Sequence, residues 1–193
     1  MRRSAIACSR RCTRRLRARC TASDLPMVEP GLTDDEIARV EDTFGFEFAG
    51  DHRAFLAAGV PVGASWPDWR GEGRRSLAKR LQLPAEGVLF AVEWAQFWHD
   101  GWGKRPARMK DALRSARYQL ERVPQLVPVC AHHYLPAGRG TVGHPVLSVV
   151  RTDVVVASAN LADYLAGKFG ADAAPTVEFW SDLVSPFDVS GER

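Results

Sequence analysis

The first strong hydrophobic pattern of the chain predicts an amphipathic helix that begins after Thr33. Thr33 and Glu36 have the spacing of a capping box, in which each side chain bonds to the backbone amide of the other residue. Apolar residues then recur at helical spacings and a glycine ends the pattern, at Ile37, Val40, Phe44 and Gly45. A second short helix is predicted after Gly50, with Phe55 and Leu56 on its apolar side.

The next segments predict one more short helix and one strand. Residues 74–81 place Leu77 and Leu81 on one helical face, and the helix is expected to end before Pro84. Residues 87–94 are rich in β-branched and aromatic side chains and follow a glycine, which favours a strand. The clearest helix is predicted from Pro106 onward, with an apolar stripe of Met109, Ala112, Leu113, Ala116 and Leu120.

The last third of the chain is predicted to be mainly strand. Residues 126–135, 145–152 and 153–158 have strand composition and are joined by short turns. Asn160 then caps a helix that carries Leu161, Tyr164, Leu165 and Phe169 and ends at Gly170, and residues 176–180 predict a final strand. Since strands follow one another through turns, the pattern favours a single α+β domain with a largely antiparallel sheet and helices packed on it.

Charge divides the chain into two unequal parts. Residues 1–26 contain eight arginines and one acid, Asp24, for a net charge of +7, whereas residues 27–193 carry −4. Three of the four cysteines also lie in the first 26 residues. We therefore expect residues 1–26 to be a disordered tail or a mis-called start, and residues 27–193 to be the folded domain. An organelle transit peptide also fits the composition of residues 1–26, whereas a secretory signal lacks its apolar centre.

The body offers few signs of catalysis or nucleic-acid binding. It has no basic stripe for a phosphate backbone, no apolar run long enough to span a membrane, and no nucleotide-binding fingerprint. Cys130 is the one cysteine outside the tail, which fits a reducing compartment. We therefore expect a cytoplasmic protein without a cofactor, a membrane partner or a nucleic-acid partner.

Aromatic residues are the best candidates for contacts with a protein partner. Five of the six tryptophans lie between positions 66 and 102; most are expected in the core, and Trp66 and Trp69 are expected at the surface. The complete set of predicted partner contacts is Trp66, Asp68, Trp69, Arg70, Trp98, Trp102, His132, Tyr134 and Asp153.

The histidines permit an alternative hypothesis. His132 and His133 are adjacent on a predicted strand, so their side chains should point to opposite faces. His132, His144 and Asp153 could converge if their strands pair, which would suit a small metal-assisted hydrolase. Structural histidines, each bonded within the fold, are the favoured interpretation.

Several separated stretches of the body together resemble the SMI1/KNR4 family, also called the SUKH superfamily. The resemblance runs from about Gly31 to Asp182 and is carried by GLTDDEIARVE, WPDWR, GVLFAVEWAQFW, WGKRP, LVPVCAHHYLP, GHPVLSVVRTDVVV, NLADYL and FWSDL. It implies an α+β fold and a role in protein binding without catalysis. Bacterial members are similar to immunity proteins that neutralise toxin domains, and fungal members are similar to regulatory interaction modules.

Our expectation is therefore a non-enzymatic protein-binding module. The immunity role is the first hypothesis, with a basic toxin domain as the partner of the mildly acidic body. A regulatory scaffold and the metal-assisted hydrolase remain as alternatives.

Overall fold

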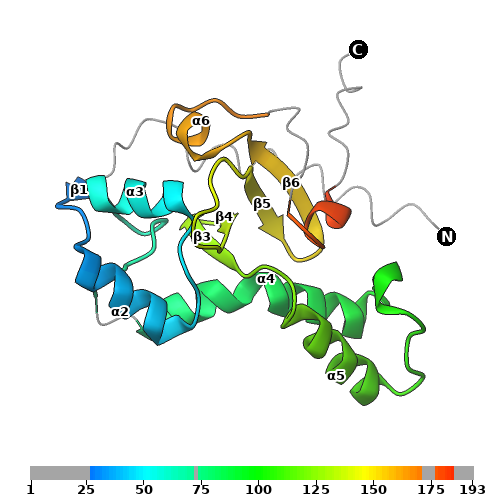
Figure 1. Ribbon diagram of the computed structural model, residues 1–193. Helices are drawn as coiled ribbons and strands as arrows, with labels where there is room; N and C mark the ends of the chain where they lie inside the picture. Colours follow the sequence, from blue (N-terminus) through cyan, green and yellow to red (C-terminus); the bar gives the residue numbers. More distant parts are fainter. Residues whose placement is uncertain (1–26, 72–73, 171–176, 185–193) are drawn as a thin grey trace, which may run out of the picture.

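The computed structural model describes residues 27–71, 74–170 and 177–184, and shows one α+β domain (Figure 1). The predicted tail, residues 1–26, lies outside the described residues. Strands β1 (Met27–Glu29) and β2 (Val60–Val62) pair antiparallel, with Met27 opposite Val62. The main sheet has four antiparallel strands in the order β3-β4-β5-β6. The predicted fold class is therefore confirmed.

Helices α2 (Asp34–Phe44) and α3 (Gly50–Ala58) form as the sequence predicts. Both bonds of the capping box are present, because the amide of Glu36 donates to Thr33 Oγ1 and the amide of Thr33 donates to a Glu36 carboxylate oxygen. Gly45 ends α2 in the left-handed conformation, with φ of 70°. Ile37 and Val40 are buried, so the predicted apolar face is the face that packs.

Helix α4 (Arg74–Trp94) corrects two predictions. It runs through Pro84 without ending, and residues 87–94 are its last two turns instead of a strand. A proline inside a helix removes one amide, here the amide that would donate to the carbonyl of Arg80. Tyr134, on the sheet, donates its hydroxyl to that carbonyl at 3.3 Å, so the carbonyl keeps a partner. Burial of Tyr134 raises the pKa of its hydroxyl to about 12, so it stays a donor.

This contact leads to a prediction on stability. We expect Tyr134→Phe to lower the free energy of unfolding by about 1–3 kcal/mol, because the partly buried carbonyl of Arg80 loses its partner. In a Pro84→Ala background the new amide can bond to the same carbonyl, so the cost of Tyr134→Phe should fall to less than half. Urea unfolding of the four proteins measures this difference, and Tyr118→Phe, at an exposed tyrosine on the next helix, is the matched control. Equal costs in both backgrounds would contradict the link between Tyr134 and Pro84.

A 3-10 helix, η1 (Asp100–Trp102), connects α4 to α5 (Met109–Leu120). Helix α5 starts three residues after Pro106, so Pro106 precedes the helix instead of occupying its first turn. Ala112, Ala116 and Leu120 are buried, as predicted, whereas Met109 is 40% exposed. Small residues on α5 let it lie close to α4 around Val92.

The four strands are β3 (Leu126–Cys130), β4 (His133–Pro136), β5 (Val146–Val150) and β6 (Asp153–Ser158). The predicted continuous strand 126–135 is therefore two strands, separated by a turn in which Ala131 has φ of 50°. A second tight turn, with φ of 59° at Arg151, joins β5 to β6.

The remaining elements are short. Asn160 caps α6 (Leu161–Leu165) by accepting from the amide of Asp163, and Phe169 lies beyond the end of this helix. Residues 177–180, the described part of the predicted last strand, form a turn that leads into the 3-10 helix η2 (Ser181–Leu183). The predicted strand is wrong here, because the amide of Ser181 bonds to the carbonyl of Val177 and coils the chain.

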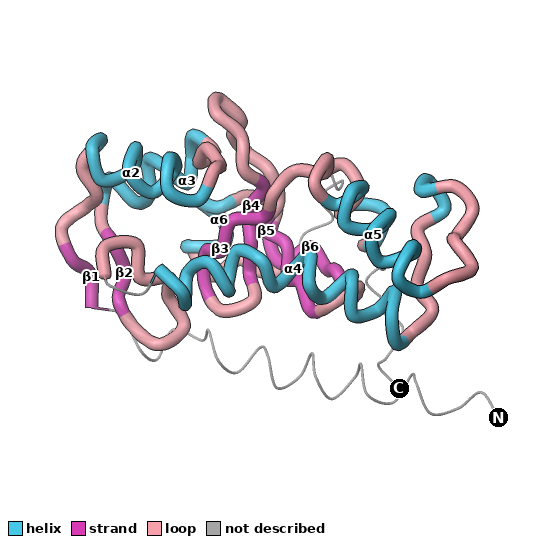
Figure 2. Tube along the Cα trace, turned by 90° about the horizontal axis from the view of Figure 1, so that it is seen from below, coloured by secondary structure: helices cyan, strands magenta, loops and turns pink. Residues whose placement is uncertain are grey.

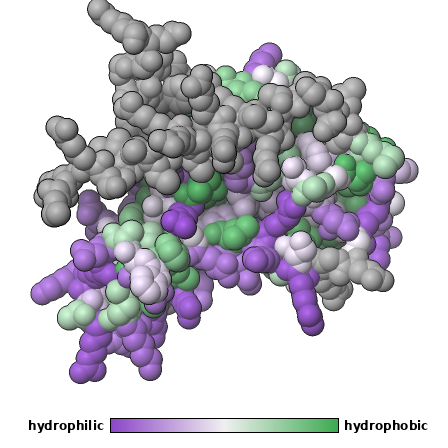
Figure 3. Space-filling model, turned by 180° about the vertical axis from the view of Figure 1, so that it is seen from behind, coloured by the Kyte–Doolittle hydropathy of each residue, from purple (hydrophilic) through white to green (hydrophobic). Residues whose placement is uncertain are grey.

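Helix α4 joins the parts of the domain. It crosses one side of the main sheet, with α2 and α3 near its beginning and α5 near its end (Figures 1 and 2). Leu77 and Leu81 pack with α2 residues, Val88 packs with the sheet, and Val92 packs with α5. From behind, the described surface is mostly hydrophilic, with separate hydrophobic patches (Figure 3). No helix among the described residues is long and apolar enough to cross a membrane.

Candidate functional site

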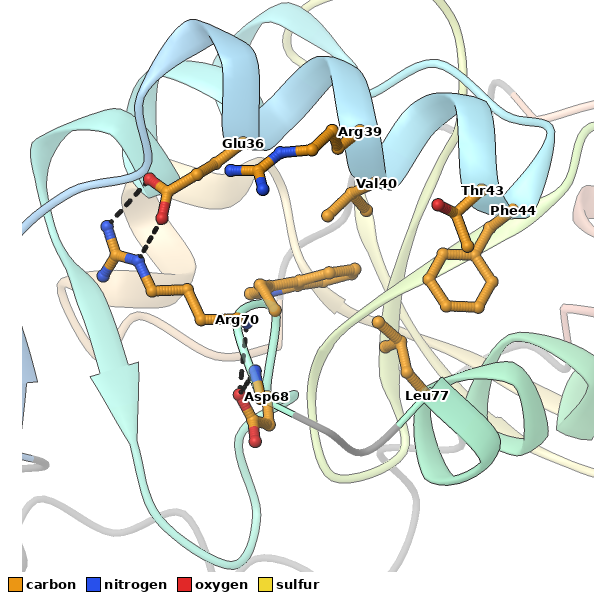
Figure 4. Close-up of a pocket in the computed structure, with 10 residues that line it drawn as sticks. Glu36, Arg39, Val40, Thr43, Phe44, Asp68, Arg70 and Leu77 are labelled. Carbon is orange, nitrogen blue, oxygen red and sulfur yellow. Dashed lines mark hydrogen bonds and ion pairs between the residues drawn. The ribbon is translucent and has the colours of Figure 1, made fainter.

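The loop after β2 carries four of the predicted contact residues and is fastened to the start of α2 by Arg70. The guanidinium donates to the backbone carbonyls of Pro30 and Gly31, at 2.6 Å each. It also donates to both carboxylate oxygens of Glu36, at 2.8 and 3.1 Å (Figure 4). The loop and the helix are therefore held as one surface, which lowers the entropy lost when a partner binds.

Glu36 has a double role in this arrangement. Its carboxylate accepts from Arg70 and, through the capping box, from the amide of Thr33. The bond from Arg70 is the main reason that the pKa of Glu36 falls to about 2, and the bond from Thr33 adds to the effect. The lowered pKa keeps Glu36 charged at neutral and mildly acidic pH.

Asp68 and Trp69 shape the loop itself. The Asp68 carboxylate accepts from the amides of Arg70 and Gly71, at 3.2 and 2.6 Å. This turn directs Trp69 into the core, where 6% of its surface is exposed and its ring meets Phe48 edge-on at 5.1 Å. The prediction that Trp69 lies at the surface is wrong, whereas Asp68 and Arg70 are exposed. Trp66 is half-buried and packs against Phe55.

A small pocket of about 220 Å³ lies between this loop and α2. In Figure 4, Leu77 of α4 points toward Phe44, and Glu36, Arg39 and Arg70 form a charged rim at the other end. Pockets that hold small molecules usually measure about 300–1,000 Å³. This pocket is smaller than that range.

The segment that contains β1 and α2 is rich in acidic residues. Residues 27–53, which include β1, α2 and the first part of α3, contain eight acids and two arginines, for a net charge of −6. We call this surface the acidic face. Asp34, Asp35, Asp42 and Glu47 are exposed there, and the side chain of Asp34 is 90% exposed. Two arginines from outside this segment pair with its acids, because Arg70 contacts Glu36 and Arg139 contacts Glu47.

Trp98 and Trp102 belong to a different cluster. Trp98 donates its ring N–H to the carbonyl of Gly103 at 2.7 Å, and its ring lies edge-on to Trp102 at 5.3 Å. Trp102 stacks on Phe179, in the turn before η2, whereas Trp98 packs against the α4 and α5 core around Val92 and Ala112. Both are half-buried, and they lie outside the pocket lining.

The predicted contacts on the sheet are brought together only in part. Tyr134 is 2% exposed, so its side chain is not available to a partner. The rings of His132 and His133 lie 4.3 Å apart, which corrects the prediction of opposite faces, because the turn at Ala131 breaks the strand before them. His133 is buried and its Nδ1 lies 2.8 Å from the hydroxyl of Tyr164.

The predicted metal ligands do not meet. His132 and Asp153 lie beside the end of β5, because the carbonyl of His132 accepts from Val149 and Asp153 pairs with Val150. His144 precedes the first residue of β5, and a five-residue strand spans about 13 Å. Within the described part of the chain, no three His, Cys, Asp or Glu side chains are grouped closely enough to hold a metal ion.

The structure also shows an exposed aromatic residue that the sequence analysis missed. Trp94 lies at the end of α4 and is 71% exposed. The other described tryptophans are buried or half-buried. Because residues 87–94 were interpreted as a strand, Trp94 was not recognised as lying on the same helical face as Leu83 and Phe90. The spacing of seven and four residues between these three positions is the signal that a helical interpretation would have found.

Comparison with known proteins adds no relative. No protein-family model, curated protein or solved structure matches this chain.

Proposed function

We propose that this chain is a non-enzymatic protein-binding module of the SMI1/KNR4 type, and that it acts as an immunity protein against a toxin domain. The observation that carries the proposal is the acidic face, which has a net charge of −6 and whose Glu36 lines a pocket of about 220 Å³. Complementary charge accelerates the encounter of two proteins and orients them. A basic toxin domain is the partner that this surface fits.

The geometry of the loop supports the same proposal. Arg70 fastens the loop that carries Asp68 to the start of α2, and the half-buried Trp66 of the same loop packs against Phe55 of α3. Interfaces of high affinity use such pre-ordered anchors, with aromatic side chains beside charged ones. The buried thiol of Cys130 and the absence of a membrane-spanning helix among the described residues are compatible with our proposal of a cytoplasmic location.

Charge reversal on the acidic face tests the proposal. We expect the double variant Asp35→Lys/Asp42→Lys to bind the toxin domain encoded beside this chain about tenfold more slowly at low salt, because the steering field is weakened. The difference should shrink at high salt, where exposed charges are screened. Stopped-flow or surface-based kinetics at two ionic strengths measures both effects.

The matched control is Glu121→Lys/Glu178→Lys. It changes the net charge by the same amount at two exposed acids outside the acidic face. Equal slowing by both double variants would show an effect of total charge only, and would contradict a docking surface on α2. Failure of the native chain to co-purify with the toxin domain, or to protect cells that produce it, would contradict the immunity role itself.

A further inference from the structure

The outer side of α4 carries an apolar patch that the proposed function does not use. Leu83 and Phe90 are each 44% exposed and Trp94 is 71% exposed. Their spacing of seven and four residues places all three on one stripe of the helix. We call these three residues the α4 patch.

The turn after β5 lies directly against α4, along one edge of the α4 patch. A Cβ atom on Gly87 would lie 2.7 Å from the Cα of Arg151, so only glycine permits this approach. The guanidinium of Arg151 lies 4.5 Å from the ring centre of Phe90 and holds this ring in place. Figures 1 and 2 show α4 on the outside of the domain, with its outer side free of other described elements.

We propose that the α4 patch is a dimer interface, in which α4 packs antiparallel against α4 of a second copy of this chain. The charged residues beside the apolar stripe of α4 favour a second copy of this chain as the partner. Arg75 and Lys79 lie in the first half of the helix, and Glu86 and Glu93 lie in its second half, on the same flank of the stripe. An antiparallel copy therefore brings the basic half of each helix beside the acidic half of the other.

The same geometry pairs the apolar residues. When Leu83 of one copy faces Phe90 of the second copy, Lys79 comes level with Glu93 of that copy, and the two-fold axis repeats both contacts. A parallel arrangement would place like charges together. Because one helix from each copy makes a small interface, the dimer is weak and forms at micromolar concentrations. This proposal is independent of the acidic face and of the immunity role.

Sedimentation of the full chain from about 1 to about 500 µM tests the proposal. The native chain should show a concentration-dependent dimer, and Trp94→Ala and Phe90→Ala should each raise the dimer Kd at least about tenfold. Tyr118→Ala is the matched control, because this tyrosine is 51% exposed on α5, away from the α4 patch, and should leave the Kd unchanged. Thermal unfolding by circular dichroism verifies that each variant is folded.

Charge exchange identifies the antiparallel arrangement. Lys79→Glu and Glu93→Lys should each weaken the dimer about threefold to tenfold, and the double variant should return to within about twofold of the native Kd. A chain that stays monomeric at about 500 µM overturns the proposal, as does a dimer that is insensitive to Trp94→Ala. Additive weakening in the double charge variant overturns the antiparallel arrangement. Loss of binding to another protein on Trp94→Ala, in a monomeric chain, would assign the α4 patch to that protein and overturn the dimer.

Discussion

Lowering the pH from 7 to about 4 is expected to reduce the free energy of unfolding by about 3 kcal/mol through His52 alone. His52 is 1% exposed, and neither of its ring nitrogens has a hydrogen-bond partner among the described residues. Its ring lies among aromatic neighbours, 5.1 Å from Phe48 and 6.1 Å from Trp69. Burial without a partner disfavours the charged imidazolium and lowers the pKa of His52 from 6.5 to about 3.

The sign of the effect follows from the lowered pKa. Between pH 6.5 and about 3 the unfolded chain binds a proton at His52 that the folded chain does not bind, so stability rises with pH in this window. The contribution is fully present above pH 6.5 and is lost as the pH falls toward 3. Carboxylates titrate in part of the same range, so the contribution of His52 is the difference between the native chain and a variant without this histidine.

His52→Phe is the suitable variant, because it keeps an aromatic ring in the cluster and removes both nitrogens. We expect urea unfolding at several pH values to show a steeper loss of stability in the native chain, and a variant that is as stable or more stable at pH 7. Parallel pH profiles for the two proteins would contradict a buried, neutral His52 and would require a hydrogen-bond partner for its ring.

Trp69→Ala is expected to lower the free energy of unfolding by about 3–5 kcal/mol, the range for removal of a buried aromatic side chain. Trp69 packs with residues of α2 and α4 in one core cluster and meets Phe48 edge-on. Trp66→Ala, three residues earlier in the same loop, should cost about 1 kcal/mol, because Trp66 is half-buried. Denaturant unfolding of the two variants measures the contrast.

The two tryptophans should also differ in binding. Trp66→Ala should weaken the proposed toxin complex at unchanged fold, whereas Trp69→Phe, which keeps most of the buried surface, should bind normally. A Trp69→Ala variant as stable as the native chain would show that Trp69 is a contact residue after all, as its position in a Gly- and Pro-rich turn first indicated.

The sequence predicted those parts of the fold that depend on local chemistry. The capping box of Thr33 and Glu36, the glycine at position 45 and the Asn160 cap form bonds within a few residues, so they can be recognised without the rest of the chain. The α+β class and the antiparallel order followed from strands separated by short turns. Asp68 and Arg70, two of the predicted contact residues, are exposed.

Only the tertiary structure determined the full length of α4, the burial of Trp69 and the residues that contact the histidines. Pro84 ends a helix when its missing amide leaves a carbonyl without a partner, and here Tyr134 supplies that partner from a position fifty residues away in the chain. Residues 87–94 are almost uniformly apolar, so strand and helix have the same pattern there, and packing between the sheet and α5 selects the helix. A local pattern fixes which bonds a segment can make by itself, whereas a bond to a distant residue exists only after the chain has folded.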